Sequence, residues 1–247
     1  MHQPLKGKKA LVTGGSRGIG AAIVTRLAAD GADVAFTYSK SLNEADALRK
    51  EAAKHGGKII AIQADANRPE AMASLVANAM KELGAIDILV NNAGVWSQGD
   101  IGDITEEEFQ RVMRVNVDSV FALTNAATPL MASGARIINI SSCLGERASG
   151  ISMSTYVASK FAVCGLTRGW AKDLGARNIL VNAVLPGPID TDMNPANGEY
   201  ADAQKAQTAL GRYGRPEEIA GAVAFFAGPD ASYITGATLL VDGGREA

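Results

Sequence analysis

A tyrosine and a lysine, Tyr156 and Lys160, lie four residues apart in a helical pattern, shortly after two serines, Ser141 and Ser142. Residues four apart on a helix share one face. A phenol with a pKa of about 10 is a poor acid–base catalyst at neutral pH, but a neighbouring ammonium favours its ionised form and lowers that pKa. Beside a serine hydroxyl, such a pair could protonate a carbonyl oxygen. On spacing alone, a tyrosine and a lysine four residues apart are more often a surface pair.

Two residue types on which other enzymes rely are scarce. The 247 residues include two histidines, His2 and His55, and two cysteines, Cys143 and Cys164. This excludes a disulfide scaffold and a histidine-rich or cysteine-rich metal site, and it argues against a Ser-His-Asp or Cys-His hydrolase. Cys143 follows Ser142, where a reactive thiol is conceivable, but it has no basic neighbour in the sequence to lower its pKa, so we interpret it as a small apolar residue.

A glycine-rich segment, TGGSRGIG, follows a short apolar run and opens an amphipathic helical pattern. Glycines at a strand-to-helix turn permit a tight bend and let the backbone approach a pyrophosphate, which the amides of the helix N-terminus attract. The composition alone also fits a plain turn, and the position after the first strand favours a dinucleotide. The residues expected to contact the cofactor here are Gly14, Ser16, Arg17, Gly18, Ile19 and Gly20.

The second predicted strand ends at Tyr38, about 18 residues after the last of these glycines, where dinucleotide folds often carry an acid. No carboxylate is present in the sequence TYSKS. An acid would repel a 2′-phosphate, whereas Arg17, Ser39 and Lys40 could bind one through charge-assisted hydrogen bonds. The sequence therefore favours NADP(H) over NAD(H), unless Arg17 and Lys40 are ordinary solvated surface charges.

Two further loops follow predicted strands: Asp65 and Ala66 after the third, and Asn92, Ala93 and Gly94 of the NNAG motif after the fourth. A loop acid can accept a hydrogen bond from an adenine amino group, and small residues let a cofactor lie against the backbone. Asn, Asp and Gly are also the usual turn residues, so turn chemistry remains an alternative, above all for Asp65.

Short β-branched runs alternate with longer helical periods along residues 1–247, which predicts a single doubly wound α/β (Rossmann) domain with a mainly parallel seven-stranded sheet flanked by helices. The strands are apolar throughout, as expected when helices cover both faces. They are predicted at Lys9–Val12, Asp33–Thr37, Lys58–Gln63, Ile86–Val90, Ala135–Ser141, Ile179–Leu185 and Thr238–Val241. Helices are predicted at Gly18–Asp30, Leu42–His55, Pro69–Leu83, Thr105–Met131, Thr155–Leu174 and Pro216–Ala227.

One stretch, Pro186–Gly214, interrupts this alternation. It begins with prolines and glycines and continues into a polar helical piece, Glu199–Ala209. Long loops in compact domains are often lids. We therefore expect residues 186–214 to be a mobile segment on the substrate side.

The motifs TGGSRGIG, NNAG, NISS, YVASK, LPGPIDT and ITGATLLVDGG occur in this order, with Asn116 between the second and third. In this set the chain resembles the short-chain dehydrogenase/reductase superfamily, and within it the 3-oxoacyl-[acyl-carrier-protein] reductase-like group. The resemblance implies an NADP(H)-dependent reductase that transfers hydride to a carbonyl or acyl-thioester substrate. It also implies a homotetramer or homodimer formed through the helices Thr105–Met131 and Thr155–Leu174.

The resemblance further implies a catalytic tetrad of Asn116, Ser142, Tyr156 and Lys160. Ser142 rather than Ser141 matches the family serine, because the glycine three residues on is Gly145. In this assignment Ser142 polarises the substrate oxygen and Tyr156 donates the proton. Lys160 holds the nicotinamide ribose and lowers the tyrosine pKa. Asn116 holds a water that links Lys160 to solvent, or else is a satisfied core amide. The nicotinamide-side loop comprises Pro186, Gly187, Ile189 and Thr191.

Two departures bear on the substrate. The segment before the fifth strand, LMASGAR, lacks a basic patch for an acidic carrier protein, which leaves Arg136 and Arg177. The sequence PGPIDTDMNPANG is similar to a subgroup that includes cyclic-di-GMP-binding proteins, which implies nucleotide sensing as an alternative function. Retention of the whole tetrad favours a reductase. Trp96 and Met153 could line the substrate cleft or fill the core.

The overall charge gives no indication of a polyanionic partner. Lys and Arg total 24 against 26 for Asp and Glu, a formal net charge of −2, so neither nucleic acid nor an anionic membrane is expected as a partner. The start of the chain is polar and basic, unlike a signal peptide, and no apolar run is long enough for a membrane span. We expect a cytoplasmic protein.

Overall fold

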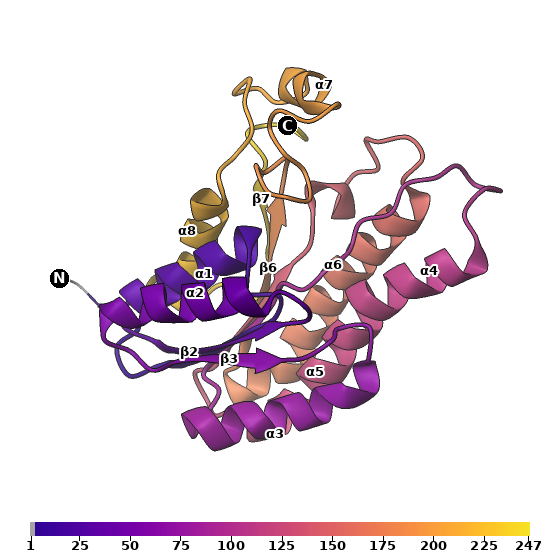
Figure 1. The fold of residues 1–247 in the computed structure, drawn as a ribbon. Coiled ribbons are helices and arrows are strands. Elements are labelled where there is room, and N and C mark those ends of the chain that lie inside the picture. Colours follow the sequence, from indigo (N-terminus) through magenta and orange to yellow (C-terminus); the bar gives the residue numbers. More distant parts are fainter. Residues whose placement is uncertain (1–2) are drawn as a thin grey trace.

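A computed structural model describes residues 3–247, which form a single α/β domain around one seven-stranded sheet (Figure 1). The strand order is β3-β2-β1-β4-β5-β6-β7, and every neighbouring pair is parallel. The strands are β1 Lys9–Val12, β2 Asp33–Tyr38, β3 Ile59–Gln63, β4 Ile88–Asn91, β5 Arg136–Ile140, β6 Leu180–Pro186 and β7 Thr238–Val241. The predicted fold is confirmed. His2 lies outside the described residues.

Helices connect the strands and cover both faces of the sheet (Figure 1). They are α1 Gly18–Ala29, α2 Leu42–Ala52, α3 Met72–Leu83, α4 Glu106–Met113, α5 Ser119–Ala127, α6 Ser154–Leu174, α7 Ala201–Ala206 and α8 Pro216–Ala227. On one face α1 packs against α8, and on the other α3 packs against α5 while α6 packs against β6.

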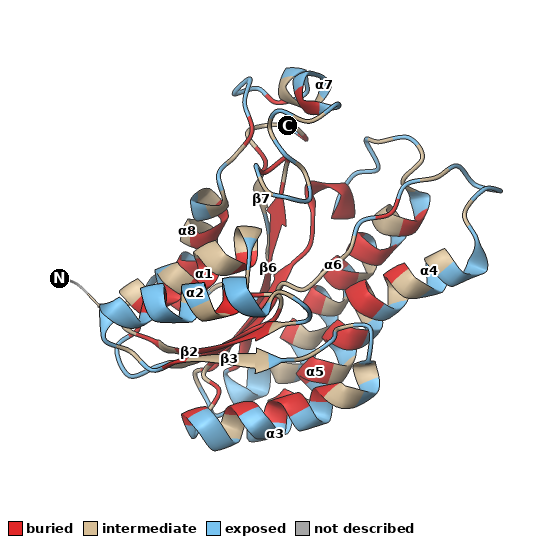
Figure 2. Cartoon of the chain, in the orientation of Figure 1, coloured by how far each residue is buried: buried red, intermediate tan, exposed pale blue. Residues whose placement is uncertain are grey.

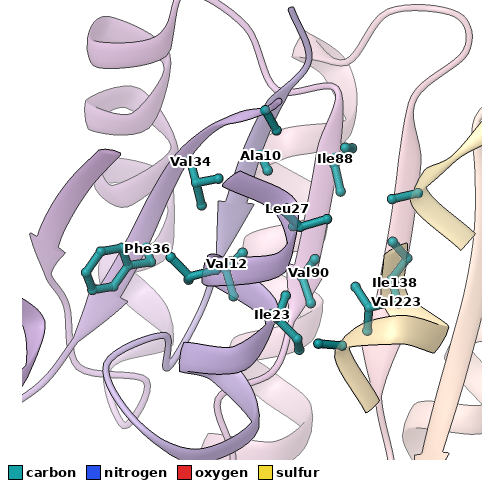
Figure 3. Close-up of a cluster of buried hydrophobic side chains, with 14 of the residues drawn as sticks. Ala10, Val12, Ile23, Leu27, Val34, Phe36, Ile88, Val90, Ile138 and Val223 are labelled. Carbon is teal, nitrogen blue, oxygen red and sulfur yellow. The ribbon is translucent and has the colours of Figure 1, made fainter. Parts of the chain in front are cut away.

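Two hydrophobic cores hold the sheet between these layers, because successive strand residues point to opposite faces. In β1, Val12 faces the core that contains Ile23 of α1 and Val223 of α8 (Figure 3), whereas Leu11 faces the core that contains Leu75 of α3. Figure 2 shows the central strands buried and the outer surfaces of the helices exposed. Burying one such aliphatic side chain contributes about 1.5–3 kcal/mol. The sheet is thus a rigid support for the loops at its carboxyl edge.

The direction of chain progression reverses at β1, which pairs with β2 on one side and with β4 on the other. The connections after β1 and β4 therefore lead to opposite faces and leave a crevice at the carboxyl ends of the strands. The predicted cofactor residues follow β1, β2, β3, β4 and β6. The topology places all of these loops along one edge of the sheet.

The predicted helix Thr105–Met131 is confirmed as one unbroken helical run from Glu106 to Leu130, although the type of helix changes along it. It is divided into α4, a π-helical turn at Arg114–Asp118, α5 and a 3₁₀ turn at Thr128–Leu130. Pro129 cannot donate the amide hydrogen bond that would extend α5. The predicted helical piece Glu199–Ala209 is shorter in the structure, where only α7 is helical. Just after α7, the Thr208 hydroxyl donates to the Lys205 carbonyl at 2.9 Å. The ends of the other predicted helices and strands differ by at most three residues.

Candidate active site

The glycine-rich turn after β1 is held so closely that larger residues do not fit. Gly14 and Gly18 have positive φ angles of 62° and 53°. A Cβ atom on Gly20 would lie 2.1 Å from the carbonyl oxygen of Gly14. The Asn92 side chain donates to the carbonyls of Thr13 and Gly14 at 2.9 and 3.0 Å. The turn is therefore fixed by backbone contacts that only glycine permits.

The N-terminus of α1 has no side-chain cap. Arg17 occupies the N-cap position without a capping hydrogen bond, and the first turn of α1 contains no acidic residue. The leading amides of the helix are thus without an intrahelical partner, as a phosphate-binding helix end requires. Ser16 is half-buried in the turn, and Ile19 packs against the core below it. The residues present fit the pyrophosphate of a dinucleotide.

The end of β2 lies against this turn. Gly15 donates its amide to the Thr37 carbonyl at 2.8 Å, and Gly14 donates to the Thr37 hydroxyl at 2.9 Å. Tyr38 is half-buried, whereas Ser39 and Lys40 are exposed. The structure therefore brings the acid-free end of β2 next to the glycine-rich turn, as expected.

Arg17 lies on the surface, with Nη1 3.9 Å from Asp192 Oδ2 on the opposite side of the crevice. Both side chains are well exposed, so this pair contributes little to stability. The Arg17 guanidinium can therefore release Asp192 and bind another anion in its place.

Asp65 takes part in turn chemistry, as the alternative interpretation held. Its Oδ1 atom accepts a hydrogen bond from the amide of Asn67 at 2.9 Å. The other carboxylate oxygen has no side-chain hydrogen bond with residues 3–247. Ala66 and Ala93 line one hollow with Thr13, Thr37 and Asn91 at the carboxyl ends of the central strands. The hollow joins the loops after β3 and β4 to the glycine-rich turn.

The NNAG motif combines support with open space. Asn91 donates to Asn139 Oδ1 at 2.8 Å inside the protein, a role the sequence did not reveal. Ala93 donates its amide to the Thr13 hydroxyl at 3.0 Å. A Cβ atom on Gly94 would lie 3.5 Å from Lys160 Nζ. The missing side chain of Gly94 thus leaves space in front of the lysine.

Ser142, Tyr156 and Lys160 lie together at the crevice, on the 3₁₀ turn after β5 and on the first turns of α6. Burial raises the pKa of Tyr156 to about 12, against a hydrogen bond with Ser142 that lowers it. Burial lowers the pKa of Lys160 to about 8. Lys160 Nζ donates to the Ile140 carbonyl at 3.2 Å and lies 5.5 Å from the centre of the Tyr156 ring.

The expectation that Lys160 lowers the tyrosine pKa is wrong for this structure. The pKa of Tyr156 is raised because loss of hydration on burial outweighs the hydrogen bond with Ser142. The ammonium group faces the ring and the Ile140 carbonyl. The phenol is protonated at neutral pH with or without this shift, as a proton donor must be.

Asn116 lies in the π-helical turn and is a satisfied core amide. Its Nδ2 donates to the Val95 carbonyl and to Ser159 Oγ, both at 3.0 Å, and its Oδ1 accepts the Val95 amide at 2.8 Å. Ser159 in turn donates to the Tyr156 carbonyl at 2.7 Å. The side chain thus ties the loop after β4 to the turn of α6 that carries Tyr156.

Sequence reasoning missed Ser159, although a small polar residue beside Lys160 was a signal. The water-holding role of Asn116 stays a prediction.

The predicted nicotinamide-side loop closes the crevice from the β6 side. Gly187 donates its amide to the Val241 carbonyl at 3.1 Å, and a Cβ atom there would lie 2.6 Å from the Cα of Asp242. Pro186 ends β6, and Ile189 is buried. The Thr191 methyl group would lie 3.3 Å from a Cβ on Gly18. The loop therefore reaches the N-terminus of α1.

Trp96 lines the site beside the tyrosine. The centroid of its ring is 4.6 Å from that of the Tyr156 ring, and Trp96 is partly exposed to solvent. Met153 is partly buried at the N-terminus of α6.

Cys143 is buried, which raises the pKa of its thiol to about 11, in agreement with the interpretation of an unreactive residue. Arg136 and Arg177 lie at the opposite edge of the sheet, where the strands begin. Arg136 is the first residue of β5, and Arg177 is in the 3₁₀ turn after α6.

Residues 14–246 match the family profile described as enoyl-(acyl carrier protein) reductase. The chain is 42% identical to the cyclic-di-GMP-binding biofilm dispersal mediator protein of Escherichia coli K12 over 96% of both chains. The chain belongs to the short-chain dehydrogenase/reductase superfamily. It is also 40% identical to the 3-oxoacyl-[acyl-carrier-protein] reductase FabG of Staphylococcus aureus, over 96% of this chain and 97% of that one.

Solved short-chain dehydrogenase/reductase structures agree with this assignment. A blue fluorescent protein from a metagenomic library, in complex with NADPH, superposes with a TM-score of 0.97 at 53% identity, over 99% of this chain and 100% of the other. A short-chain dehydrogenase from Burkholderia cenocepacia, in complex with NADP, has a TM-score of 0.97 at 48% identity with the same coverage. The protein is therefore an NAD(P)-dependent oxidoreductase of this superfamily.

Residues 3–247 contain neither a cluster of metal-ligating side chains nor a membrane-spanning helix. Three or more His, Cys, Asp or Glu side chains suited to a metal ion do not cluster anywhere in that range. None of the helices described there has the length and apolar character needed to span a membrane.

Proposed function

We propose that the protein is an NADP(H)-dependent reductase of carbonyl substrates in which Tyr156 protonates the substrate oxygen. The observation that carries the proposal is the position of Tyr156, Ser142 and Lys160 at one crevice with the uncapped N-terminus of α1. When bound, the reduced nicotinamide supplies the hydride. The chain itself must then orient the carbonyl, supply the proton and hold the cofactor.

Each of these tasks has a group of suitable chemistry. The Ser142 hydroxyl orients the substrate oxygen beside the phenol of Tyr156. That phenol is protonated at neutral pH, and burial raises its pKa further, to about 12. Lys160, next to the space in front of Gly94, holds the hydroxyl groups of the nicotinamide ribose. Asn116 keeps α6 in register with the loop after β4.

The preference for NADP(H) rests on the end of β2. Arg17, Ser39 and Lys40 supply two positive charges and a hydroxyl at the place where a carboxylate would select NAD(H). Similar proteins solved with NADPH or NADP support the same preference.

We further propose a substrate of the 3-oxoacyl type, with an apolar portion beside its carbonyl. Trp96 offers an aromatic wall next to Tyr156, and Met193 and Tyr200 of the segment 186–214 expose large apolar surfaces. Identity of 40% to a 3-oxoacyl-[acyl-carrier-protein] reductase supports this class. Specificity would then come from residues 186–214.

The test is oxidation of NADPH with a panel of 3-oxoacyl thioesters and small ketones. Tyr156→Phe removes the proton donor and should lower kcat about 10²- to 10⁴-fold while leaving NADPH affinity unchanged. Tyr233→Phe is the matched control, because Tyr233 is fully exposed. Equal turnover of parent and Tyr156→Phe would refute the proposed role.

A second candidate function is nucleotide binding without turnover, which identity to a cyclic-di-GMP-binding protein supports. Calorimetric titration with cyclic-di-GMP, alone and after saturation with NADPH, separates the two functions. Binding that NADPH abolishes would place the nucleotide in the same crevice, and the absence of heat would remove this candidate.

We also propose that the protein is a homotetramer or homodimer. Phe109, Phe121 and Phe161 are partly exposed on α4, α5 and α6. These helices lie together, because α4 packs against α6 and all three contact the π-helical turn between α4 and α5. Large exposed aromatic side chains of this kind are typical of interfaces. Light scattering on the purified protein gives its mass and decides the assembly state.

A further inference from the structure

The C-terminal residues Asp242–Glu246, here called the tail, connect three loops that surround the candidate site. These are the nicotinamide-side loop after β6, the substrate-side segment before α8, and the loop between β5 and α6. Figure 1 shows the C-terminus beside α7, at the carboxyl edge of the sheet.

A buried aspartate fixes the course of the tail. Asp242 is nearly inaccessible to solvent, and its two carboxylate oxygens accept the amides of Gly244 at 2.9 Å and Glu246 at 3.0 Å. Gly243 and Gly244 have positive φ angles of 66° and 77°. The chain therefore turns back toward the site immediately after β7.

The tail contacts two of the loops through its backbone. Gly187 of the nicotinamide-side loop approaches Asp242 so closely that a Cβ atom would lie 2.6 Å from the Asp242 Cα. Leu210 of the substrate-side segment donates its amide to the Gly243 carbonyl at 3.1 Å. A Cβ atom on Gly244 would lie 2.8 Å from the Cβ of Ala209.

The third contact joins the exposed Ser149 to the buried side chain of Glu246. Ser149, in the loop between Ser142 and α6, donates its hydroxyl to Oε1 of Glu246. The Glu246 side chain is 3% exposed and that of Arg245 is 9% exposed, with Arg245 Nε 3.5 Å from the same carboxylate oxygen. A charged group is costly to bury unless it is paired and hydrogen-bonded. The pairing of Glu246 with Ser149 and Arg245 meets this condition only when the loop is in place.

We propose that Glu246 and Ser149 are positioning residues that fix the loop 146–153 over the substrate side of the crevice. This inference deepens the proposed function and rests on it for its kinetic consequences. The tail holds the β5–α6 loop, the nicotinamide-side loop and residues 209–210 in one arrangement. Loss of the Ser149–Glu246 contact should act on substrate binding, because the nicotinamide-side loop is held separately by the backbone contacts of Gly187 with Val241 and Asp242.

The experiment combines hydrogen–deuterium exchange of the full chain with steady-state kinetics. Glu246→Ala and Ser149→Ala should each speed exchange of the amides of residues 146–153 about tenfold or more. Both should raise KM for the carbonyl substrate about tenfold, with the NADPH dissociation constant changed less than about twofold. Glu246→Gln keeps an oxygen that accepts the Ser149 hydroxyl and should restore most of both properties. Glu44→Gln, an exposed acid on α2, is the control.

Two further outcomes decide the proposal. Because Ser149 acts through Glu246, Ser149→Ala/Glu246→Ala should be no worse than Glu246→Ala alone. Exchange in 146–153 that is unchanged in both Ser149→Ala and Glu246→Ala overturns the inference. If Glu246→Ala does not fold, Ser149→Ala and Glu246→Gln decide it. Failure of the proposed function would appear instead as no NADPH oxidation by the parent, and the exchange measurement would still test the tail.

Discussion

The two walls of the crevice are built in different ways. The cofactor wall consists of backbone groups from the turns after β1 and β4, packed so closely that glycine is required at Gly14 and Gly20. The substrate wall consists of side chains from distant segments, among them Trp96, whose ring is tilted against that of Tyr156, and the partly buried Ser149–Glu246 pair. A backbone wall allows little variation, whereas a side-chain wall can change without disturbing the sheet.

The contrast indicates how one fold can keep its cofactor while its substrates vary. A change on the cofactor wall should act on the whole fold, because the turn is part of the sheet–helix packing. A change on the substrate wall should act on substrate KM. Each prediction below compares these two responses.

The largest expected effect is on the cofactor wall. Gly20→Ala would place a methyl group 2.1 Å from the Gly14 carbonyl oxygen and should reduce the free energy of unfolding by about 3 kcal/mol or more. For a chain of this size that is a fall in Tm of about 6–12 °C. Gly221→Ala in α8 is the matched control, since its nearest neighbour is a flexible arginine end at 3.9 Å. It should stabilise the protein by about 0.5–1 kcal/mol. Equal Tm values would contradict the close packing of the turn.

The second prediction concerns the lysine between the two walls. Burial lowers the pKa of Lys160 to about 8, below its ordinary value of 10.5, so the native state disfavours the charged form. Between these two values the unfolded state binds more protons, and stability therefore rises with pH through that window. At pH 7 the full cost is present. Lys160→Met should consequently raise the free energy of unfolding at pH 7 by about 1–3 kcal/mol, although it removes a proposed catalytic residue.

Urea unfolding at intervals from pH 7 to pH 10 measures this effect. The stability advantage of Lys160→Met over the parent should shrink as pH rises from 8 toward 10. Measurements stop there, because the raised pKa of Tyr156 makes the parent lose stability above pH 10. An advantage that is independent of pH would mean that better apolar packing, rather than charge burial, is responsible.

The sequence predicted the parts of the site that depend on local spacing. The glycines of the first turn, the acid-free end of β2 and the Tyr156–Lys160 pair are each defined within a few residues of a strand or helix end. Their elements follow from the alternation of apolar runs with helical periods. The topology then brings these ends together, because parallel strands share one carboxyl edge.

The sequence could not predict contacts between distant segments or the orientation of charges. Ser149 and Glu246 are 97 residues apart, and the π-helical turn at Asn116 depends on its bonds to Val95 and Ser159. The pKa of Tyr156 is raised because burial outweighs the hydrogen bond with Ser142, and the lysine ammonium lies 5.5 Å from the centre of the ring. Spacing along a helix does not determine that orientation.

A smaller effect is expected where the cofactor wall uses side chains instead of backbone. Arg17→Ala/Lys40→Ala removes two exposed positive charges beside the proposed 2′-phosphate site and should raise KM for NADPH about 10- to 100-fold. KM for NADH should change less than about threefold, and Tm should stay unchanged because both residues are exposed. Lys81→Ala/Lys172→Ala removes the same charge from the last turns of α3 and α6 and is the control. Equal changes for the two cofactors would contradict recognition of the 2′-phosphate.

The smallest expected effect is on the substrate wall and tests its independence from the cofactor. Trp96→Ala removes an aromatic pair whose centroids are 4.6 Å apart, and such pairs contribute about 0.5–1.5 kcal/mol. KM for an apolar 3-oxoacyl thioester should rise about 2- to 10-fold, while KM for NADPH stays constant. Trp96→Phe keeps a ring and should stay close to the parent. If Trp96→Ala instead raised KM for NADPH, the indole would belong to the cofactor wall and the division between the two walls would fail. A constant KM for both would restrict the substrate wall to residues 186–214 and the loop that Glu246 holds.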